Sequence, residues 1–267
     1  MAFEKTRVLG KTGLKVGPLG VASSFGAPAS AFEEAFDRGC NYFYWGSLRK
    51  RGMRDAIRHL CARGRREDMV IVVQSYSRSA SLMKSFFEKA LKSLGLDHAD
   101  ILILGWYNRP PSKRIIDQAA TMRDRGLFRF LGLSGHNRSL FPRLAESGLF
   151  DLFHVRYNAA HRGAEKEIFP HVQGPDRPGI VSYTATRWAQ LLNPKKMPPG
   201  EDPPSASHCY RFVLSNPGVD VCMCGPRDEA QMREALRTLD LGPLSPEELD
   251  RMRKIGDYVH ARSARFL

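Results

Sequence analysis

The chain has 267 residues, of which 42% are apolar, enough to build the core of one large domain or two small ones. Its formal net charge of +13 at pH 7 makes a nucleic acid, a phosphorylated small molecule and an acidic membrane surface all eligible as partners. No run of 18 apolar residues occurs, and the N-terminal residues MAFEKTRVLG lack the apolar segment of a signal peptide. We therefore expect a cytoplasmic protein without a membrane span.

Neither the cysteines nor the cations form a known binding pattern. The five cysteines are odd in number and lack the C-x-x-C spacing of a zinc site, which suits a reducing compartment; Cys222 and Cys224 are expected to be buried thiols. The positive residues form short clusters at 49–51, 63–66 and 195–196, without a continuous basic helix. Solvated surface charge is the simpler interpretation, and nucleic acid is not an expected partner.

β-rich runs recur along the chain with helical stretches between them. In order, these runs are 16–23, 41–45, 68–75, 100–106, 128–135, 152–158, 179–185 and 219–225. Such alternation predicts a parallel sheet with crossover helices. Because there are eight strands and the glycine fingerprint of a Rossmann fold is missing, we predict an α/β fold of the closed (β/α)₈ TIM-barrel type, with residues 1–267 as a single domain.

Four further segments have clear local signals. Residues 7–16 (RVLGKTGLKV) predict a β-hairpin that turns at 11–13 and plugs the bottom of the barrel. Ser245 is a candidate N-cap, with Pro246 at the first helical position and Glu248 placed for a capping box. The proline-rich residues 193–205 are expected to form a long connection or a lid. Residues 81–94 predict a helix with one apolar face formed by Leu82, Met83, Phe86, Phe87, Ala90, Leu91 and Leu94.

The ends of the predicted strands carry different chemistry from their beginnings. In such barrels the active site lies at the carboxyl ends of the strands. Carboxylates stand at the beginnings, at Asp68, Asp100, Asp151 and Asp220. The far ends carry Tyr44, Trp45, Gln74, Tyr76, Trp106, Tyr107, Ser134, His136, His154, Arg156, Tyr183 and Arg227. The expected site is therefore aromatic, amidic and cationic.

This inventory argues against several reactions. Glycoside hydrolysis needs two carboxylates, and magnesium or zinc needs clusters of carboxylates or imidazoles. His136, His154 and His161 lack a nearby acid to orient them, so no metal site is predicted. Ser134 lies in GLSGH and not in the G-x-S-x-G turn of a nucleophilic serine. A pocket for an anion and a flat ring remains.

The ordered set of segments resembles the aldo-keto reductase superfamily, whose members are NADPH-dependent carbonyl reductases built on a (β/α)₈ barrel. The resemblance extends over nearly the whole chain. It is carried by RVLGKTGLKVGPLG, KALKSLGLDHADILIL, LGLSGHNRSL, FDLFHVRYN, VSYTATR and VLSNPGVDVCMCGPRDEAQMREAL.

The resemblance implies an NADPH site. Ser134 and His154 match the positions that hold the nicotinamide carboxamide, with Gly135 in place of the usual asparagine and His154 in place of the usual glutamine. Tyr183 matches the aromatic residue that stacks on the nicotinamide. The adenosine phosphates are expected at Gly225, Arg227 and Gln231, where a helix N-terminus adds its backbone amides, and Ala235 replaces an asparagine near the adenine.

The resemblance also implies that the catalytic residues have been replaced. In GCNYFYWGS (39–47), Tyr44 stands where an aspartate is expected, and the loop around Arg49 stands where the proton-donating tyrosine is expected. Gln74 replaces the lysine and Gly105 the histidine. Tyr44, or alternatively Tyr107, is the candidate replacement donor if a cation such as Arg49 lowers its pKa. Equally, residues 42–45 simply fill the pocket.

Two functions follow as competing expectations. The first is an NADPH-dependent oxidoreductase that reduces a small carbonyl-like substrate through a non-standard proton donor, with the basic mouth favouring an acidic substrate. The second is a catalytically inactive barrel that binds the nucleotide and acts as a sensor or protein-interaction module. Nucleic-acid binding, which rests on charge alone, is the weakest alternative.

Overall fold

A barrel of eight parallel strands forms the centre of the computed structural model, which describes residues 3–46 and 50–262. The strands follow one another around the barrel in chain order, and β10 closes it by pairing with β3. They are β3 (Leu19–Ala22), β4 (Tyr42–Trp45), β5 (Val70–Ser75), β6 (Ala99–Leu104), β7 (Phe128–Gly135), β8 (Leu152–Arg156), β9 (Gly179–Tyr183) and β10 (Val221–Cys224). The predicted (β/α)₈ fold is confirmed.

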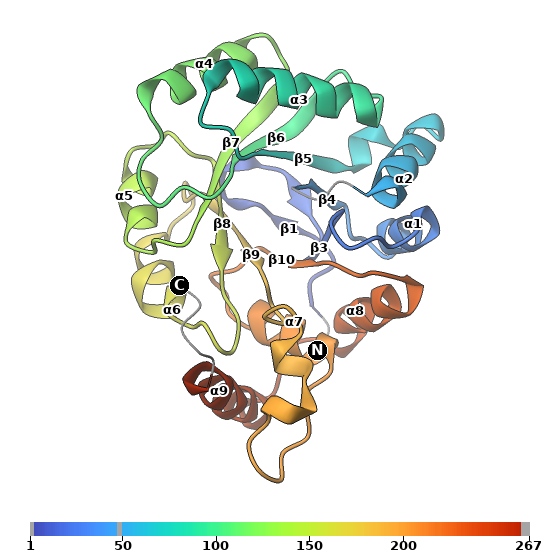
Figure 1. Cartoon of the computed structure of the whole chain (residues 1–267), viewed down its shortest axis with the longest axis vertical. Coiled ribbons are helices and arrows are strands. Elements are labelled where there is room, and N and C mark those ends of the chain that lie inside the picture. Colours follow the sequence, from blue (N-terminus) through green and yellow to red (C-terminus); the bar gives the residue numbers. More distant parts are fainter. Residues whose placement is uncertain (1–2, 47–49, 263–267) are drawn as a thin grey trace.

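Helices surround the strands in a ring (Figure 1). In the described residues these are α1 (Ala29–Asp37), α2 (Arg51–Ala62), α3 (Ala80–Leu94), α4 (Lys113–Asp124), α5 (Leu140–Glu146), α6 (Ala164–Glu167), α7 (Ala206–Leu214), α8 (Glu229–Leu241) and α9 (Pro246–Ala261). Short 3₁₀ turns are η1 (Gly10–Thr12), η2 (Arg66–Asp68), η3 (Phe169–His171), η4 (Gln190–Leu192) and η5 (Pro194–Lys196). None of the described helices is long and apolar enough to span a membrane.

Alternation along the strands separates two apolar cores. In β4, Tyr42 and Tyr44 point into the barrel, whereas Phe43 and Trp45 pack against the helices. The outer core joins sheet and helices, and it includes the buried thiols of Cys222 and Cys224, which are free as predicted. The inner core is the filling of the barrel itself, so the barrel is solid and not a channel.

The N-terminal hairpin closes the bottom of the barrel. It pairs β1 (Arg7–Val8) with β2 (Lys15–Val16) in antiparallel register. Leu9, between β1 and η1, is fully buried in the inner core and packs against Gly179, where an added β-carbon would collide with it. The Lys11 N–H donates to the Arg177 carbonyl at 2.8 Å, which anchors the turn. The predicted plug is confirmed.

Aspartates at the start of three strands bind the neighbouring strand. Asp100, Asp151 and Asp220 each accept a hydrogen bond of 2.8 Å from a backbone N–H, of Ile71, Leu131 and Ile180 respectively. Asp220 also forms an ion pair with Arg177, and Asp100 with Arg66 at 3.1 Å. These carboxylates therefore stabilise the bottom face.

The local predictions hold with one correction. Ser245 and Glu248 form the predicted capping box at the start of α9. Helix α3 is present, but its apolar stripe is wider than the buried face, because Leu82 and Phe86 are about half exposed (49% and 48%). Residues 193–205 run beyond α7 at the bottom of the view in Figure 1 and contain η5 as a short regular turn.

Candidate active site

The carboxyl ends of the eight strands meet at one face of the barrel, here called the mouth. The loops of the described residues that follow the strands are rich in cations: Lys50, Arg78, Arg109, Arg138, Arg162, Arg187, Lys195, Lys196 and Arg227. The carboxylates of these described loops are Glu201, Asp202 and Asp228. Glu201 is paired with Arg251. No group of three histidines, cysteines or carboxylates in the described ranges is arranged to hold a metal ion.

His154 lies inside the barrel, below the mouth. It is 1% exposed, and its Nε2 is hydrogen bonded to the Tyr42 hydroxyl at 2.7 Å. The rings of Tyr44 and His154 are 5.3 Å apart between centroids, so the imidazole is covered from above. Burial lowers the pKa of His154 to about 3, and the ring is therefore neutral at physiological pH. Within the barrel, His154 thus contacts both Tyr42 of the inner core and Tyr44 nearer the mouth.

Tyr44, Gln74 and Gly105 form a packed corner where the resemblance implies catalytic residues. The Tyr44 hydroxyl donates to Gln74 Oε1, and both side chains are buried (9% and 3% exposed). A β-carbon at Gly105 would collide with the Gln74 amide and the Tyr76 ring. A β-carbon at Gly46 would collide with the Tyr44 ring. The glycines thus make room for the two larger side chains.

The environment of Tyr44 makes its phenol a weaker acid. Burial is the main reason that its pKa is raised well above the usual value, and the neighbouring Tyr76 adds to the shift. Arg49, which was expected to lower this pKa, lies outside the described residues. The alternative donor, Tyr107, also has a raised pKa because of burial, although Arg78, 3.7 Å above its ring, opposes the shift.

Ser134 is hydrogen bonded to the loop between β6 and α4. Its hydroxyl accepts the Trp106 N–H at 3.0 Å, and its carbonyl accepts the Tyr107 N–H at 2.7 Å. A β-carbon at Gly135 would collide with the Tyr107 carbonyl oxygen. Gly135 is therefore what allows this loop to fold so closely over the end of β7, and an asparagine there would push the loop away.

Tyr183 belongs to a row of rings at the mouth. It is half-buried, and its hydroxyl donates to the Gly135 carbonyl at 3.2 Å. His136 stacks on it with a centroid distance of 6.2 Å and an interplanar angle of 28°. Trp106, which is 60% exposed, continues the row at 6.0 Å from His136. The row offers flat apolar surface next to the packed corner.

Arg156, half-buried at the end of β8, stands opposite Tyr183 in the register of the β8–β9 pair. Its alternation with Leu152 and His154 directs it inward. Within the described part of the chain, its guanidinium has no hydrogen bond or ion pair. It is thus a charge that no group of the described chain neutralises.

Gly225, Arg227 and Gln231 come together at the start of α8. Gln231 Oε1 accepts the Arg227 N–H at 3.1 Å, and the Asp228 carboxylate caps the helix by accepting the Gln231 N–H at 2.8 Å. The Arg227 side chain is exposed. Gly225 lies against Phe25, which would block a side chain there. The exposed guanidinium beside a helix N-terminus suits an anion.

The loop after β9 has an unusual backbone. Thr184, Arg187, Trp188 and Ala189 all have positive φ, from 50° to 62°, although none is glycine. Each such residue costs roughly 1–2 kcal/mol. Arg187 is 9% exposed, and its guanidinium donates to the Val259 carbonyl at 3.1 Å, which holds the loop against α9. Strained backbone of this kind is concentrated at functional sites.

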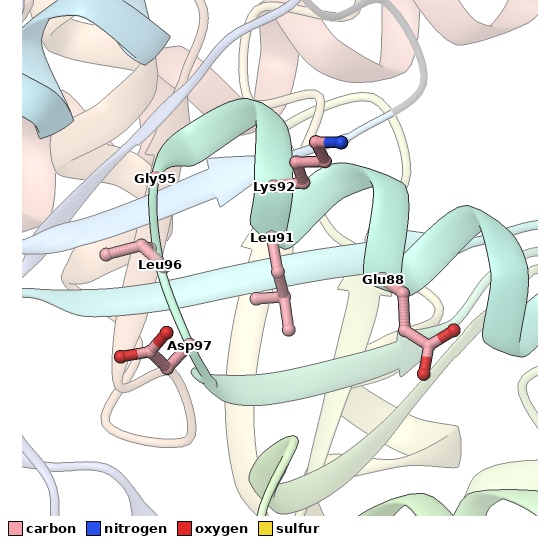
Figure 2. A pocket seen from close by; sticks show the side chains of 6 residues that line it. All are labelled: Glu88, Leu91, Lys92, Gly95, Leu96 and Asp97. Carbon is pink, nitrogen blue, oxygen red and sulfur yellow. The ribbon is translucent and has the colours of Figure 1, made fainter.

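A shallow depression on the outside of the barrel lies far from these residues. Figure 2 shows Glu88, Leu91, Lys92, Gly95, Leu96 and Asp97 around it, at the end of α3 and in the turn that leads to β6. Because this turn precedes a strand, the depression belongs to the face opposite the mouth. It is open to solvent, and we assign it no function.

The predicted site residues thus form two groups. Tyr44, His154, Ser134 and Tyr183 lie around the mouth, and Gly225, Arg227 and Gln231 lie at the start of α8. Sequence reasoning gave no role to Tyr76, His136 or Arg156, although all three were recognised at strand ends. The signal for Arg156 was present, since it is the inward residue after His154 in a strand that carries no carboxylate.

Comparison with known proteins finds structural relatives alone. No family model and no curated protein matches the sequence. The structure is similar to aldo-keto reductase AKR11C1 from Bacillus halodurans in its holo form, with a TM-score of 0.77 and 19% identity over 94% of this chain and 96% of that one. An aldo-keto reductase from Klebsiella pneumoniae, solved in complex with NADP and acetate, gives a TM-score of 0.77 and 20% identity over 95% and 96%. The chain therefore has the fold of these reductases.

Proposed function

We infer that the protein is an NADPH-dependent oxidoreductase of the aldo-keto reductase type, acting on a small carbonyl-like substrate through a non-standard proton donor. One observation carries this inference: within a barrel of the reductase fold, the ends of β7, β9 and β10 bring Ser134, Tyr183 and Arg227 to the same mouth. The similar Klebsiella protein holds NADP in that fold.

The phosphate end of the cofactor fits well. Arg227 is exposed, and the amides of the first turn of α8 lie beside it. The Asp228 carboxylate occupies the cap, so the guanidinium of Arg227 supplies most of the attraction for a phosphate.

The ring end fits in part. Tyr183 offers a flat surface, and the Ser134 hydroxyl, which accepts the Trp106 N–H, still has its own proton to donate. His154 lies below Tyr44 and is covered by it. It would therefore act on the nicotinamide ring indirectly, through its contact with Tyr44. When bound, NADPH would supply the hydride that reduces a carbonyl carbon.

The proton for the carbonyl oxygen has two phenols as candidate sources. We retain Tyr44 as the proposed donor, because it faces the mouth and remains protonated at neutral pH. Tyr76, whose proximity adds to the raised pKa of Tyr44, is 42% exposed. Since a phenol with a raised pKa is a weak acid, turnover is expected to be slow unless the substrate needs little acid assistance.

The first experiment is an NADPH titration followed by quenching of Trp106 and Trp188 fluorescence, both of which are exposed at the mouth. Micromolar binding is expected, weakened about tenfold or more in Arg227→Ala through loss of a charge-assisted contact. Arg233→Ala, on the same helix but paired with Glu34 and Glu229, is the matched control and should bind normally. Equal binding by the unaltered protein and Arg227→Ala would contradict the site.

The packed corner favours a second function, a nucleotide-binding barrel without turnover that acts as a sensor or interaction module. This alternative is supported by the hydrogen bond between the Tyr44 hydroxyl and Gln74, which joins the two side chains to each other, and by the glycine at position 105, which has no side chain to act in catalysis. A panel of aldehydes and ketones with NADPH separates the two functions. Turnover that falls about a hundredfold in Tyr44→Phe supports the enzyme, whereas tight NADPH binding without turnover supports the sensor.

A further inference from the structure

Arg156 carries a positive charge in a place where the described residues supply no counter-ion. The carboxylates on α6 and on the nearby turn of α9 are already committed: Glu165 pairs with Arg253, Glu167 with Arg138, and Asp257 with Arg162. Among the described residues, none of these acids pairs with Arg156. A half-buried cation without a partner is costly in free energy, so its presence needs a compensating group.

The groups around Arg156 increase the positive potential. Arg187 approaches from the loop after β9 and is held by the Val259 carbonyl. His136 and His161 lie on the two neighbouring loops. Burial is the main reason that their pKa values are lowered, that of His161 to about 3, and Arg156 lowers both further. The positive charge of Arg156 thus adds to the effect of burial on both imidazoles.

The cluster also lies beside a flat surface. Arg156 stands opposite Tyr183 in the strand register, and His136 stacks on Tyr183. Trp106 extends the same row of rings toward solvent. A ligand that places an anion on Arg156 therefore has aromatic surface for the rest of its atoms.

We propose that Arg156 binds the carboxylate of the substrate, so that the substrate class is a small carbonyl compound that also carries a carboxylate. A guanidinium recognises a carboxylate through two parallel hydrogen bonds, which suits a planar ligand lying along the rings of His136 and Trp106. That the substrate also has a carbonyl group rests on the oxidoreductase function proposed above. The binding of a carboxylate by Arg156 does not depend on that function.

The position of Arg156 separates this site from the expected nucleotide site. Arg227 and Gln231 follow β10, whereas Arg156 ends β8, and β9 with Tyr183 lies between them. The substrate anion and the nucleotide phosphates are therefore expected on opposite sides of Tyr183.

The test compares 4-carboxybenzaldehyde with its methyl ester, which keeps the aldehyde and the ring but lacks the negative charge. Binding of each is measured by titration calorimetry, with and without saturating NADPH. The unaltered protein should bind the acid at least about tenfold more tightly than the ester. In Arg156→Gln that preference should disappear, while Arg156→Lys should keep part of it. Arg138→Gln, which removes an arginine already paired with Glu167, is the control and should keep the full preference.

Three results decide the proposal. An acid bound no more tightly than the ester, or equally well by Arg156→Gln, would overturn it. So would an NADPH affinity that falls in Arg156→Gln as much as in Arg227→Ala, because Arg156 would then serve the nucleotide. Acid binding that depends on Arg156 without any NADPH binding would support the anion site and refute the oxidoreductase instead. Arg156→Gln should unfold at an equal or higher temperature, which separates lost binding from lost folding.

Discussion

At the residue scale, His154 shows how enclosure sets the charge of a group. The imidazole is covered by Tyr44 and bonded to Tyr42, and nothing charged is needed to explain its low pKa of about 3, since burial alone accounts for it. A histidine in the unfolded chain has a pKa near 6.5. Between about pH 3 and pH 6.5, His154 therefore binds a proton in the unfolded chain but not in the folded one.

This difference predicts a pH dependence of stability. As pH falls from about 6.5 toward 3, the unfolded chain takes up a proton that folded His154 refuses, so the free energy of unfolding falls by up to about 1.4 kcal/mol per pH unit. Above that window the contribution is fully present. Plotted against pH, the unfolding free energy from denaturant titrations between pH 4 and 7 should show a shallower slope for His154→Gln than for the unaltered protein. An unaltered slope in His154→Gln would contradict this account.

Gly105 and Gln74 are coupled by space. Gly105→Ala should cost about 1–3 kcal/mol, because the new methyl group overlaps the Gln74 amide. In a Gln74→Ala background this cost should fall by about 1 kcal/mol, since the overlap with the Gln74 amide is then absent and only that with the Tyr76 ring remains. Gly135→Ala is the control: its overlap is with the Tyr107 backbone carbonyl, which Gln74→Ala does not remove. The measurement is the unfolding free energy of the single variants Gly105→Ala, Gln74→Ala and Gly135→Ala and of each glycine variant combined with Gln74→Ala. If the costs of Gly105→Ala and Gln74→Ala simply add in the double variant, the two residues are not coupled.

At the element scale, the loop after β9 combines strain with anchoring. Thr184 is held by the Asn158 amide at 2.8 Å, and Arg187 is held by α9. Two of the left-handed residues, Thr184 and Arg187, are thus each held by a hydrogen bond. Such a loop presents Arg187 and Trp188 to the mouth in one arrangement, which a relaxed loop would not.

Removing part of the strain should raise stability. Ala189 is exposed at φ 62°, so Ala189→Gly should increase the free energy of unfolding by up to about 1 kcal/mol. Ala145→Gly is the matched control: position 145 lies in α5, and the same change there should destabilise by about 1 kcal/mol. Equal losses in both variants, measured by denaturant unfolding, would show that position 189 is not strained.

At the scale of the whole molecule, the two faces of the barrel have separate tasks. Asp100, Asp151 and Asp220 bind strands together at the bottom, where the hairpin closes the inner core. The mouth has few carboxylates and many cations. This excess of cations over carboxylates in the described loops draws anions to the mouth.

Because the N-terminal hairpin closes the bottom of the barrel, we expect it to contribute strongly to the free energy of unfolding. Leu9→Ala should reduce the free energy of unfolding by about 2–5 kcal/mol, because it leaves a cavity at the closed end of the inner core. Leu82→Ala, at a position that is half exposed on α3, should cost much less. Comparable losses for the two variants would mean that the hairpin does not support the barrel.

The fold could be predicted from the sequence because it depends on repeated local signals. Eight β-rich runs, the turn at residues 11–13 and the Ser245 cap are each visible within a few residues. The site was less accessible, since its contacts join distant strands. The bond between Tyr42 and His154 spans 112 positions, and the fit of Gly135 under Tyr107 depends on how a loop folds back. The exposure of Leu82 and Phe86 was missed because periodicity cannot show how wide a face the neighbouring helices cover.

The fit between Gly105 and Gln74 also limits the routes by which this protein can change. A histidine at position 105 is excluded while the Gln74 amide occupies the space, and replacing Gln74 first removes the acceptor of the Tyr44 hydroxyl. Each single step toward the residues that the resemblance implies therefore passes through a less stable chain. Selection for stability alone would therefore keep the corner as it is, and the residues that the resemblance implies could be introduced only by several substitutions together.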